Sequence, residues 1–329
     1  MQHVRFGRTG LSVSRLCLGT MTFGLQCDEE ASRAILDAAL DAGITFIDTA
    51  NVYPGGGGPE RVGATEEIIG RWLTGRRDEI VLATKGHNPM GPQPWARGSS
   101  RKHLLAALEA SLRRLRTGHV DLYQLHRPDP GTPIDETLGA LDDMVRSGKV
   151  RYVGCSNFLA YQVARALGRS EALGTVRFDS VQPRYNLLFR QNERELFPLC
   201  AEEGLAVLPY NPVAGGLLSG KHAPGAPAAG TRFALEGAGR SYRDRYWTDE
   251  AFAVVDKLTA LAQEAAVPPG QLAIAWVLAN PVVTAPIIGA TSPGQLGNAV
   301  RAVEEPLDAD VKREIDELTK DFRKGDALR

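Results

Sequence analysis

Cysteine is scarce in this sequence of 329 residues, and its four cysteines, Cys17, Cys27, Cys155 and Cys200, form no CxxC pair. Such wide spacing argues against a disulfide framework and against a zinc site. A reducing compartment suits unpaired thiols, so we expect a cytoplasmic protein that holds no metal ion.

An excess of charge of one sign is also absent, because 38 Lys and Arg residues stand against 39 Asp and Glu residues, for a formal net charge of -1. This balance offers no general attraction to polyanions, so we expect neither nucleic acid nor a membrane surface as a partner. Hydrophobic residues at 43% and charged residues at 23% are typical of a folded globular chain rather than a disordered one.

Long hydrophobic runs are missing as well. No apolar stretch follows the polar N-terminal residues, so the sequence predicts neither a signal peptide nor an anchor. The segment 265–300 carries no formal charge, but its prolines divide it into pieces too short to span a bilayer. We interpret this segment as a buried helix followed by a buried strand.

What the sequence does contain is an unbroken alternation of short apolar runs with longer helical patterns. The segment 28–42 is typical, since Asp28 can cap a helix, apolar residues recur at helical spacing, and Gly43 can end it. Strands are expected at 16–18, 44–47, 80–83, 120–125, 150–154, 178–182, 205–208 and 282–287. Helices are expected at 28–42, 65–73, 99–115, from a Thr132 cap and Pro133 to Gly148, and at 159–167, 193–203, 249–265, 269–279, 293–303 and 308–322.

Eight strands, each with a helical connection, predict a (β/α)8 barrel that occupies residues 1–329 as one domain, after an N-terminal hairpin around 7–10. A doubly wound sheet is the alternative, but no GxGxxG fingerprint opens a helix after an early strand. The glycines at 55–58 are interpreted as a loop tip. The segment 212–247 lacks periodicity, which is typical of a functional lid or a mobile segment.

Four chemically matched residues follow three successive strands. Because the active site of a barrel lies beyond the C-terminal ends of its strands, Asp48, Tyr53, Lys85 and His126 are expected to converge there. A lysine ammonium is expected to lower the pKa of a neighbouring tyrosine and make it a better acid, while a carboxylate holds the lysine. A neutral histidine can orient a carbonyl group. The set therefore suits proton transfer to a carbonyl oxygen rather than hydrolysis.

Each of these four residues also has a structural interpretation when it is taken alone. Asp48 could cap a helix approach, Lys85 could pair with a buried acid, Tyr53 could anchor a loop, and His126 could be a satisfied core histidine. The functional interpretation rests on their occurring together.

Specific motifs add a family resemblance. They are LGTMTFG at 18–24, DAGITFIDTANVY at 41–53, ATK at 83–85 and GKVRYVGCSN at 148–157. On these motifs the chain resembles the aldo-keto reductases over nearly its whole length. The resemblance implies a (β/α)8 barrel that binds NADPH across its mouth and reduces aldehydes or ketones. It also implies that Tyr53 is the general acid, that Lys85 and Asp48 tune it, and that His126 positions the carbonyl.

The resemblance further implies the cofactor contacts. One group holds the nicotinamide, a second lies in a loop that crosses the pyrophosphate, and a third lies at a helix N-terminus suited to the 2′-phosphate. These residues are Gly19, Thr20, Met21, Gln26, Asp48, Ser156, Asn157, Gln182, Tyr210, Asn211, Pro212, Val213, Ala214, Gly215, Leu217, Lys221, Arg232, Gly289, Ala290, Thr291, Ser292, Gln295 and Asn298.

The chain departs from some relatives at the phosphate end. Those relatives place Lys or Arg where Thr291 and Gln295 stand, so NADH stays open beside NADPH. Asn298 and Ala299 stand where many relatives have Glu-Asn, which leaves the adenine contacts open.

A regulatory protein is the alternative to an enzyme, because the stretch 127–133 and the helix after it resemble potassium-channel β-subunits of the same superfamily. Those subunits bind the cofactor but depart from histidine at the position of His126, so the intact set of four favours an enzyme. A lyase or isomerase barrel would need a phosphate site or metal ligands.

The substrate is expected to be a small carbonyl compound. Aldehydes are the default class, and ketosugars or other ketones are the alternative. Loops at 54–59, 88–95 and 240–247 are candidates for the pocket wall, or alternatively for lid packing; their aromatic residues are Trp95, Tyr242, Tyr246 and Trp247. Both a monomer and a homo-oligomer are compatible with the pattern.

Overall fold

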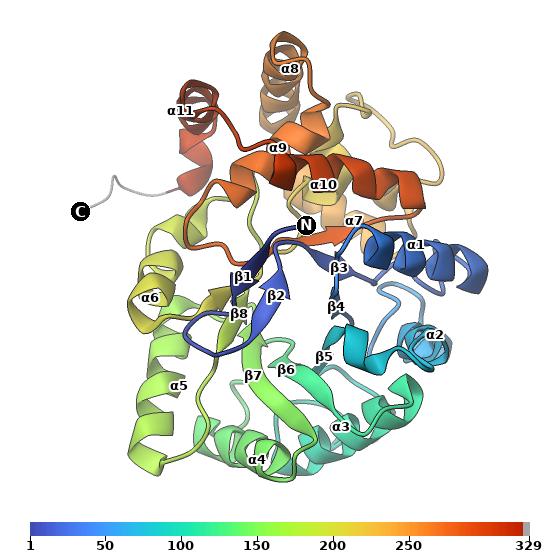
Figure 1. Ribbon diagram of the computed structural model, residues 1–329, viewed down its shortest axis with the longest axis vertical. Helices are drawn as coiled ribbons and strands as arrows, with labels where there is room; N and C mark the ends of the chain where they lie inside the picture. Colours follow the sequence, from blue (N-terminus) through green and yellow to red (C-terminus); the bar gives the residue numbers. More distant parts are fainter. Residues whose placement is uncertain (325–329) are drawn as a thin grey trace.

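A computed structural model describes residues 1–324 of the chain, and parallel strands form its centre (Figure 1). The strands of the main sheet are β3 (Cys17–Gly19), β4 (Phe46–Asp48), β5 (Val81–Gly86), β6 (Val120–Leu125), β7 (Val150–Ser156), β8 (Ser180–Gln182), β9 (Ala206–Val207) and β10 (Ile287–Gly289). Their order in the sheet is β10-β3-β4-β5-β6-β7-β8-β9, and within residues 1–324 all eight run parallel. Parallel bridges from Val207 to Val283 and from Tyr210 to Ile287 join the two edges. The predicted (β/α)8 barrel is confirmed.

A hairpin of β1 (His3–Arg5) and β2 (Ser12–Ser14) covers the N-terminal ends of the strands. Phe6 in its loop meets Phe46 edge to face, with 6.0 Å between ring centroids, and belongs to a small core inside the barrel. This core fills the N-terminal part of the barrel, and the active site of a barrel is expected at the other end, beyond the C-terminal ends of the strands.

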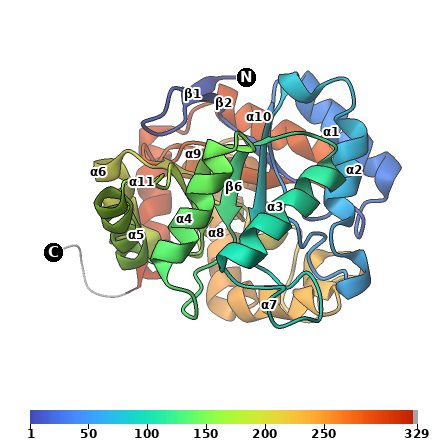
Figure 2. The ribbon, with the colours of Figure 1, turned by 90° about the horizontal axis from the view of Figure 1, so that it is seen from below.

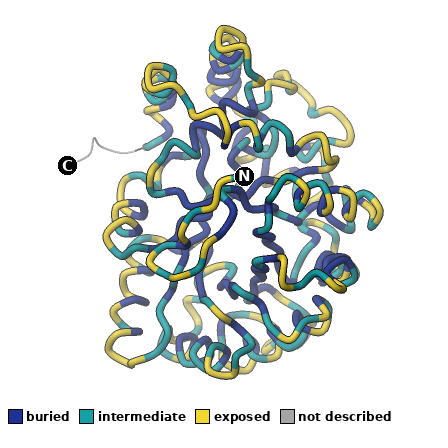
Figure 3. The backbone as a smooth tube through the Cα atoms, in the orientation of Figure 1, coloured by how far each residue is buried: buried dark blue, intermediate teal, exposed yellow. Residues whose placement is uncertain are grey.

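Helices surround the strands, with their buried faces toward the sheet and their exposed faces outward (Figure 3). They are α1 (Glu29–Asp41), α2 (Ala64–Trp72), α3 (Arg101–Leu115), α4 (Ile134–Arg146), α5 (Ala160–Leu173), α6 (Leu196–Glu203), α7 (Ala238–Tyr246), α8 (Asp249–Glu264), α9 (Pro269–Leu278), α10 (Leu296–Glu304) and α11 (Ala309–Leu318). Asp28 caps α1 as predicted, because its side chain accepts a hydrogen bond from the Ala31 amide at 2.8 Å. Across residues 1–324, every helix is too short or too polar to reach through a bilayer.

The predicted cap of α4 is wrong. Pro133 occupies the cap position itself, and Thr132 instead donates its hydroxyl to Asp129 Oδ2 at 2.8 Å. The Asp129 carboxylate, which also accepts a hydrogen bond from the Ser99 amide, therefore engages the hydroxyl that was expected to cap the helix.

The uncharged segment 265–300 forms a buried helix and then a strand, as interpreted. Every residue of α9 from 270 to 277 is buried. The strand, however, is β10, beginning at Ile287 rather than at residue 282. Pro286 has no amide to donate, and the Arg15 guanidinium binds the carbonyls of Val283 and Thr284; between residues 282 and 286, Val283 alone forms a bridge, to Val207.

The segment 212–247 is less irregular than its sequence indicates, because it contains α7. That helix buries Gly239, Tyr242 and Tyr246 and is otherwise polar, so it shows almost no apolar periodicity. Gly239 is packed so tightly that an added Cβ would lie 2.7 Å from the Phe233 carbonyl oxygen. Figure 2 shows α7 at the end of the barrel opposite β1 and β2.

Candidate active site

The tetrad predicted from sequence meets at the C-terminal ends of β4, β5 and β6. Lys85 donates from Nζ to Asp48 Oδ1, to the Thr49 carbonyl at 2.9 Å and to the Tyr53 hydroxyl at 3.4 Å. Lys85 and Asp48 are 0% and 2% exposed, so the ion pair is fully desolvated. His126 meets the Tyr53 ring edge to face, with 5.8 Å between the ring centroids.

The protonation of Tyr53 differs from the expectation. Burial raises the pKa of its hydroxyl, and this effect outweighs the Lys85 ammonium, which lowers that pKa; the net pKa lies above its ordinary value. Burial likewise opposes the charged form of Lys85, but Asp48 and Tyr53 outweigh it, so the pKa of Lys85 is raised. At neutral pH Tyr53 therefore carries a proton and Lys85 carries a charge.

His126 is held as a neutral imidazole. Burial, with Lys85 and Arg127 nearby, brings the pKa of His126 well below its ordinary value. The Asn88 side-chain amide lies 2.9 Å from Nδ1, with its nitrogen toward the ring. Because an amide nitrogen only donates, Nδ1 accepts and the proton resides on Nε2. Sequence reasoning missed Asn88, although its position three residues beyond Lys85 is a signal.

The lowered pKa of the partly exposed His126 predicts a pH dependence of stability. Below about pH 6.5 the unfolded chain protonates this histidine while the folded chain resists, so folding stability falls as the pH falls, by about 1 kcal/mol per pH unit. Urea unfolding of wild type and His126→Asn between about pH 7 and pH 5 should therefore show the wild type losing more stability. Parallel losses in the two proteins would contradict a depressed pKa.

Two glutamines hold the other oxygen of Asp48. Gln182 donates from Nε2 to Oδ2 at 2.8 Å, and Gln124 donates to the same oxygen at 3.0 Å. Sequence reasoning identified Gln182 but missed Gln124. The signal was an uncharged polar residue inside the otherwise apolar end of a buried strand, two residues before His126.

The predicted nicotinamide group comes together at the same mouth. Ser156 donates to the Gln182 carbonyl at 2.8 Å, Asn157 donates to the His126 carbonyl at 2.9 Å, and Tyr210 donates from its hydroxyl to Asn157 Oδ1 at 2.8 Å. These contacts connect the ends of β6, β7, β8 and β9. Four further predicted residues lie at or just after β3. Thr20 donates its hydroxyl to the Asp48 carbonyl at 2.9 Å, Gly19 is the last residue of β3, and Met21 and Gln26 lie in the loop between β3 and α1.

The predicted pyrophosphate group forms a left-handed turn after β9. Asn211, Ala214 and Gly215 have φ values of 60°, 49° and 71°. Asn211 Nδ2 is buried without a hydrogen-bond partner among residues 1–324. Tyr242 links the Arg232 guanidinium, at 3.3 Å, to Asn211 Oδ1, at 3.4 Å. Within this group, Pro212 and Leu217 are buried, Val213 is partly buried, and Lys221 is exposed.

The predicted phosphate end lies after β10, where Gly289, Ala290, Thr291 and Ser292 lead into α10. Here Gln295 is bound to Thr291, accepting from its amide at 2.9 Å and donating to its hydroxyl at 3.1 Å. Asn298 accepts from Arg301 at 2.6 Å. Arg301 is an exposed cation that sequence reasoning missed, because it lies in the last turn of α10 rather than at the start of the helix.

The expected aromatic wall turns out to be mostly packing. Trp247 packs against Phe233, with ring centroids 4.7 Å apart, and the buried Tyr246 hydroxyl accepts from Asn186 at 3.1 Å. Trp95 is the exception, with 57% of its surface exposed.

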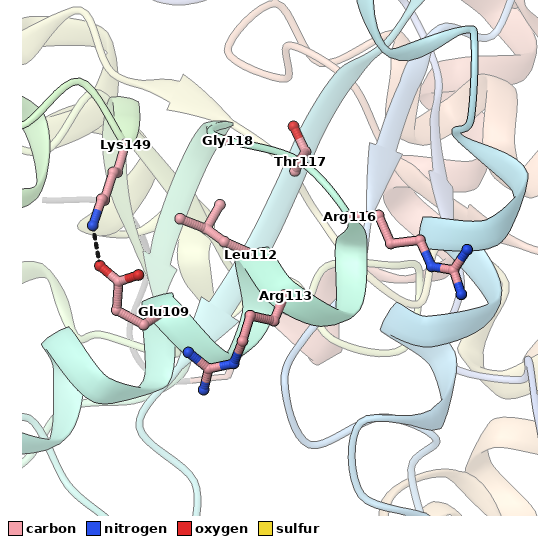
Figure 4. Close-up of a pocket in the computed structure, with 7 residues that line it drawn as sticks. All are labelled: Glu109, Leu112, Arg113, Arg116, Thr117, Gly118 and Lys149. Atoms are coloured by element: carbon pink, nitrogen blue, oxygen red, sulfur yellow. Dashed lines mark hydrogen bonds and ion pairs between the residues drawn. The ribbon is translucent and has the colours of Figure 1, made fainter.

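A hollow of about 440 Å³ lies away from this mouth, between the end of α3 and the starts of β6 and β7 (Figure 4). It contains none of the predicted site residues. The residues that line it are Glu109, Leu112, Arg113, Arg116, Thr117, Gly118 and Lys149.

Comparison with known proteins gives consistent matches. The sequence model described as "Aldo/keto reductase family" matches residues 15–320. The chain is 42% identical to "Uncharacterized oxidoreductase YrpG" of Bacillus subtilis, over 97% of this chain and 96% of that protein. It is 38% identical to "Probable voltage-gated potassium channel subunit beta" of Arabidopsis thaliana, over 92% of each chain. It is 33% identical to "Aldo-keto reductase dtxS3" of Metarhizium robertsii, over 97% of this chain and 91% of that one.

Proposed function

The chain belongs to the aldo/keto reductase family, and from this premise we propose that it reduces an aldehyde or ketone to the alcohol with NADPH. The family supports oxidoreductase chemistry on carbonyl groups. The observation that carries the specific proposal is the contact of the Tyr53 hydroxyl with the buried Lys85 ammonium, beside a neutral His126.

The proposed roles follow from these contacts. Bound NADPH would supply a hydride to the carbonyl carbon. Tyr53 donates its proton to the carbonyl oxygen as negative charge develops there, and the Lys85 ammonium stabilises the tyrosinate that remains. Asp48 keeps Lys85 charged and aimed at Tyr53. His126 offers its Nε2 proton to the same carbonyl oxygen and thereby orients the substrate.

The chain's own residues fit a dinucleotide. Asn211 Nδ2 is a buried donor without a protein partner in the described chain, and Arg232 is held close by through Tyr242, as a diphosphate would require. Ser156, Asn157 and Gln182 would hold the nicotinamide amide. For the 2′-phosphate we propose Arg301, which supplies the cation that Thr291 and Gln295 lack, so NADPH is favoured over NADH.

A regulatory subunit is the second candidate, because one relative at 38% identity bears the name of a potassium channel β-subunit. Such a protein would bind the cofactor with little turnover. The neutral, hydrogen-bonded His126 beside Tyr53 favours the enzyme, since a protein that only binds has no need of a positioned acid.

We therefore expect the absorbance of NADPH to decline when the purified protein meets a panel of aldehydes, ketones and ketosugars. NADH is tested in parallel, and we expect NADPH to be used at the lower concentration. Aldehydes are the class that we expect to turn over fastest. Tight cofactor binding without turnover of any carbonyl compound would favour the regulatory subunit instead.

A further inference from the structure

Gln124 is a polar residue that is fully buried inside the barrel. It lies in β6 with 0% of its surface exposed and pairs in register with Lys85 of β5. Toward the N-terminus, Leu122 on the same face belongs to the apolar core inside the barrel. Because a buried amide is costly unless its donor and acceptor are both satisfied, the partners of Gln124 explain its presence.

The hydrogen bonds around Asp48 fix the orientation of two amides. The carboxylate oxygen Oδ2 can only accept, so Gln124 and Gln182 must both present their nitrogen atoms to it. Gln182 donates its second N–H to Gln124 Oε1 at 3.1 Å. Both protons of the Gln182 amide are therefore engaged inside the barrel, and this amide cannot flip without placing its oxygen against a carboxylate.

The remaining atom of this amide, Gln182 Oε1, accepts no hydrogen bond from any residue between 1 and 324. The neighbouring Ser156 hydroxyl binds the main-chain carbonyl of Gln182 and not its side chain. A carboxamide N–H is the kind of donor that would satisfy Oε1.

We propose that Gln124 is a positioning residue, which locks the Gln182 amide so that Oε1 faces the nicotinamide carboxamide and which helps hold Asp48 against Lys85. This proposal rests on the proposed function, because it concerns the same cofactor. Gln124 touches neither cofactor nor substrate; it acts through Gln182 and Asp48.

Gln124→Met tests the lock, because methionine has a similar shape but neither donates nor accepts well. We expect the Kd for NADPH, measured by quenching of protein fluorescence, to rise about tenfold, since the Gln182 amide loses a partner and can turn. The matched control is Thr84→Val in β5, which removes an equally buried hydrogen bond, from the Thr84 hydroxyl to Glu66 at 2.6 Å, on the helix side of the sheet. Its Kd should stay within about twofold of wild type.

Gln124→Glu separates positioning from a purely structural role. As an acid the new side chain can donate to Asp48 and accept from Gln182, whereas as a carboxylate it repels Asp48. The Kd ratio of this variant to wild type should therefore shrink toward one as the pH is lowered, and the ratio for Thr84→Val should stay level.

A Kd for Gln124→Met within about twofold of wild type, or a Kd ratio for Gln124→Glu that stays well above one as the pH is lowered, would overturn the positioning role. Wild-type protein that binds neither NADPH nor NADH would overturn the proposed function, and the positioning role with it. Normal wild-type binding without carbonyl turnover removes the reductase but supports Gln124 whenever the Kd of Gln124→Met rises.

Discussion

Tyr53→Phe is expected to lower kcat for carbonyl reduction by about 10²–10⁴-fold, because the substitution removes the hydroxyl proton beside Lys85 while it keeps the ring. The net pKa of Tyr53 is raised by burial, so the wild-type hydroxyl is protonated at neutral pH and has a proton to give. Stopped-flow or steady-state turnover gives kcat, and fluorescence titration gives the Kd for NADPH, which should change less than about twofold.

The matched control is Tyr123→Phe. This tyrosine of β6 is also buried, and its hydroxyl makes no hydrogen bond among residues 1–324, on a face that points away from the mouth. We expect its kcat to match wild type. If Tyr53→Phe reduced cofactor binding as strongly as turnover, the role of Tyr53 as the acid would be lost.

Lys85→Met is expected to inactivate the protein and also to lower its free energy of unfolding by about 3–5 kcal/mol, because it strands the Asp48 carboxylate in a fully buried position. Lys149→Met is the control. It breaks a lysine–carboxylate pair with Glu109 whose side chains are 41% and 46% exposed, and should cost about 1 kcal/mol or less. Urea unfolding measures both variants.

The double variant Lys85→Met with Asp48→Leu separates the two effects. Removing both charges should recover most of the lost stability, since no unpaired charge stays buried, but it should restore no turnover. If Lys85→Met and Lys149→Met lowered the free energy of unfolding equally, the buried ion pair would contribute no more to stability than the exposed one.

Strand ends made much of this site predictable. Asp48, Lys85 and His126 follow apolar runs directly, and parallel strands bring such positions to one end of a barrel whatever the details of packing. Gln124 and Asn88 were missed because their positions, in the apolar end of a strand and shortly after Lys85, do not reveal which side chains they bind; only the structure shows these partners. Arg301 was missed because it lies in the last turn of α10, whereas a phosphate site is expected at the start of a helix.

The sequence by itself determined the barrel, the alternation that builds it and the tetrad at its mouth, because periodicity and strand ends are local properties of the chain. Tertiary structure alone decided the protonation state of Tyr53. Local reasoning expected Lys85 to lower the pKa of Tyr53, yet the net pKa is raised, since the desolvation of a hydroxyl depends on everything packed around it. The same holds for α7, which buries Gly239, Tyr242 and Tyr246; Gly239 packs against Phe233 and Tyr246 binds Asn186, contacts that no apolar pattern in its own residues announces.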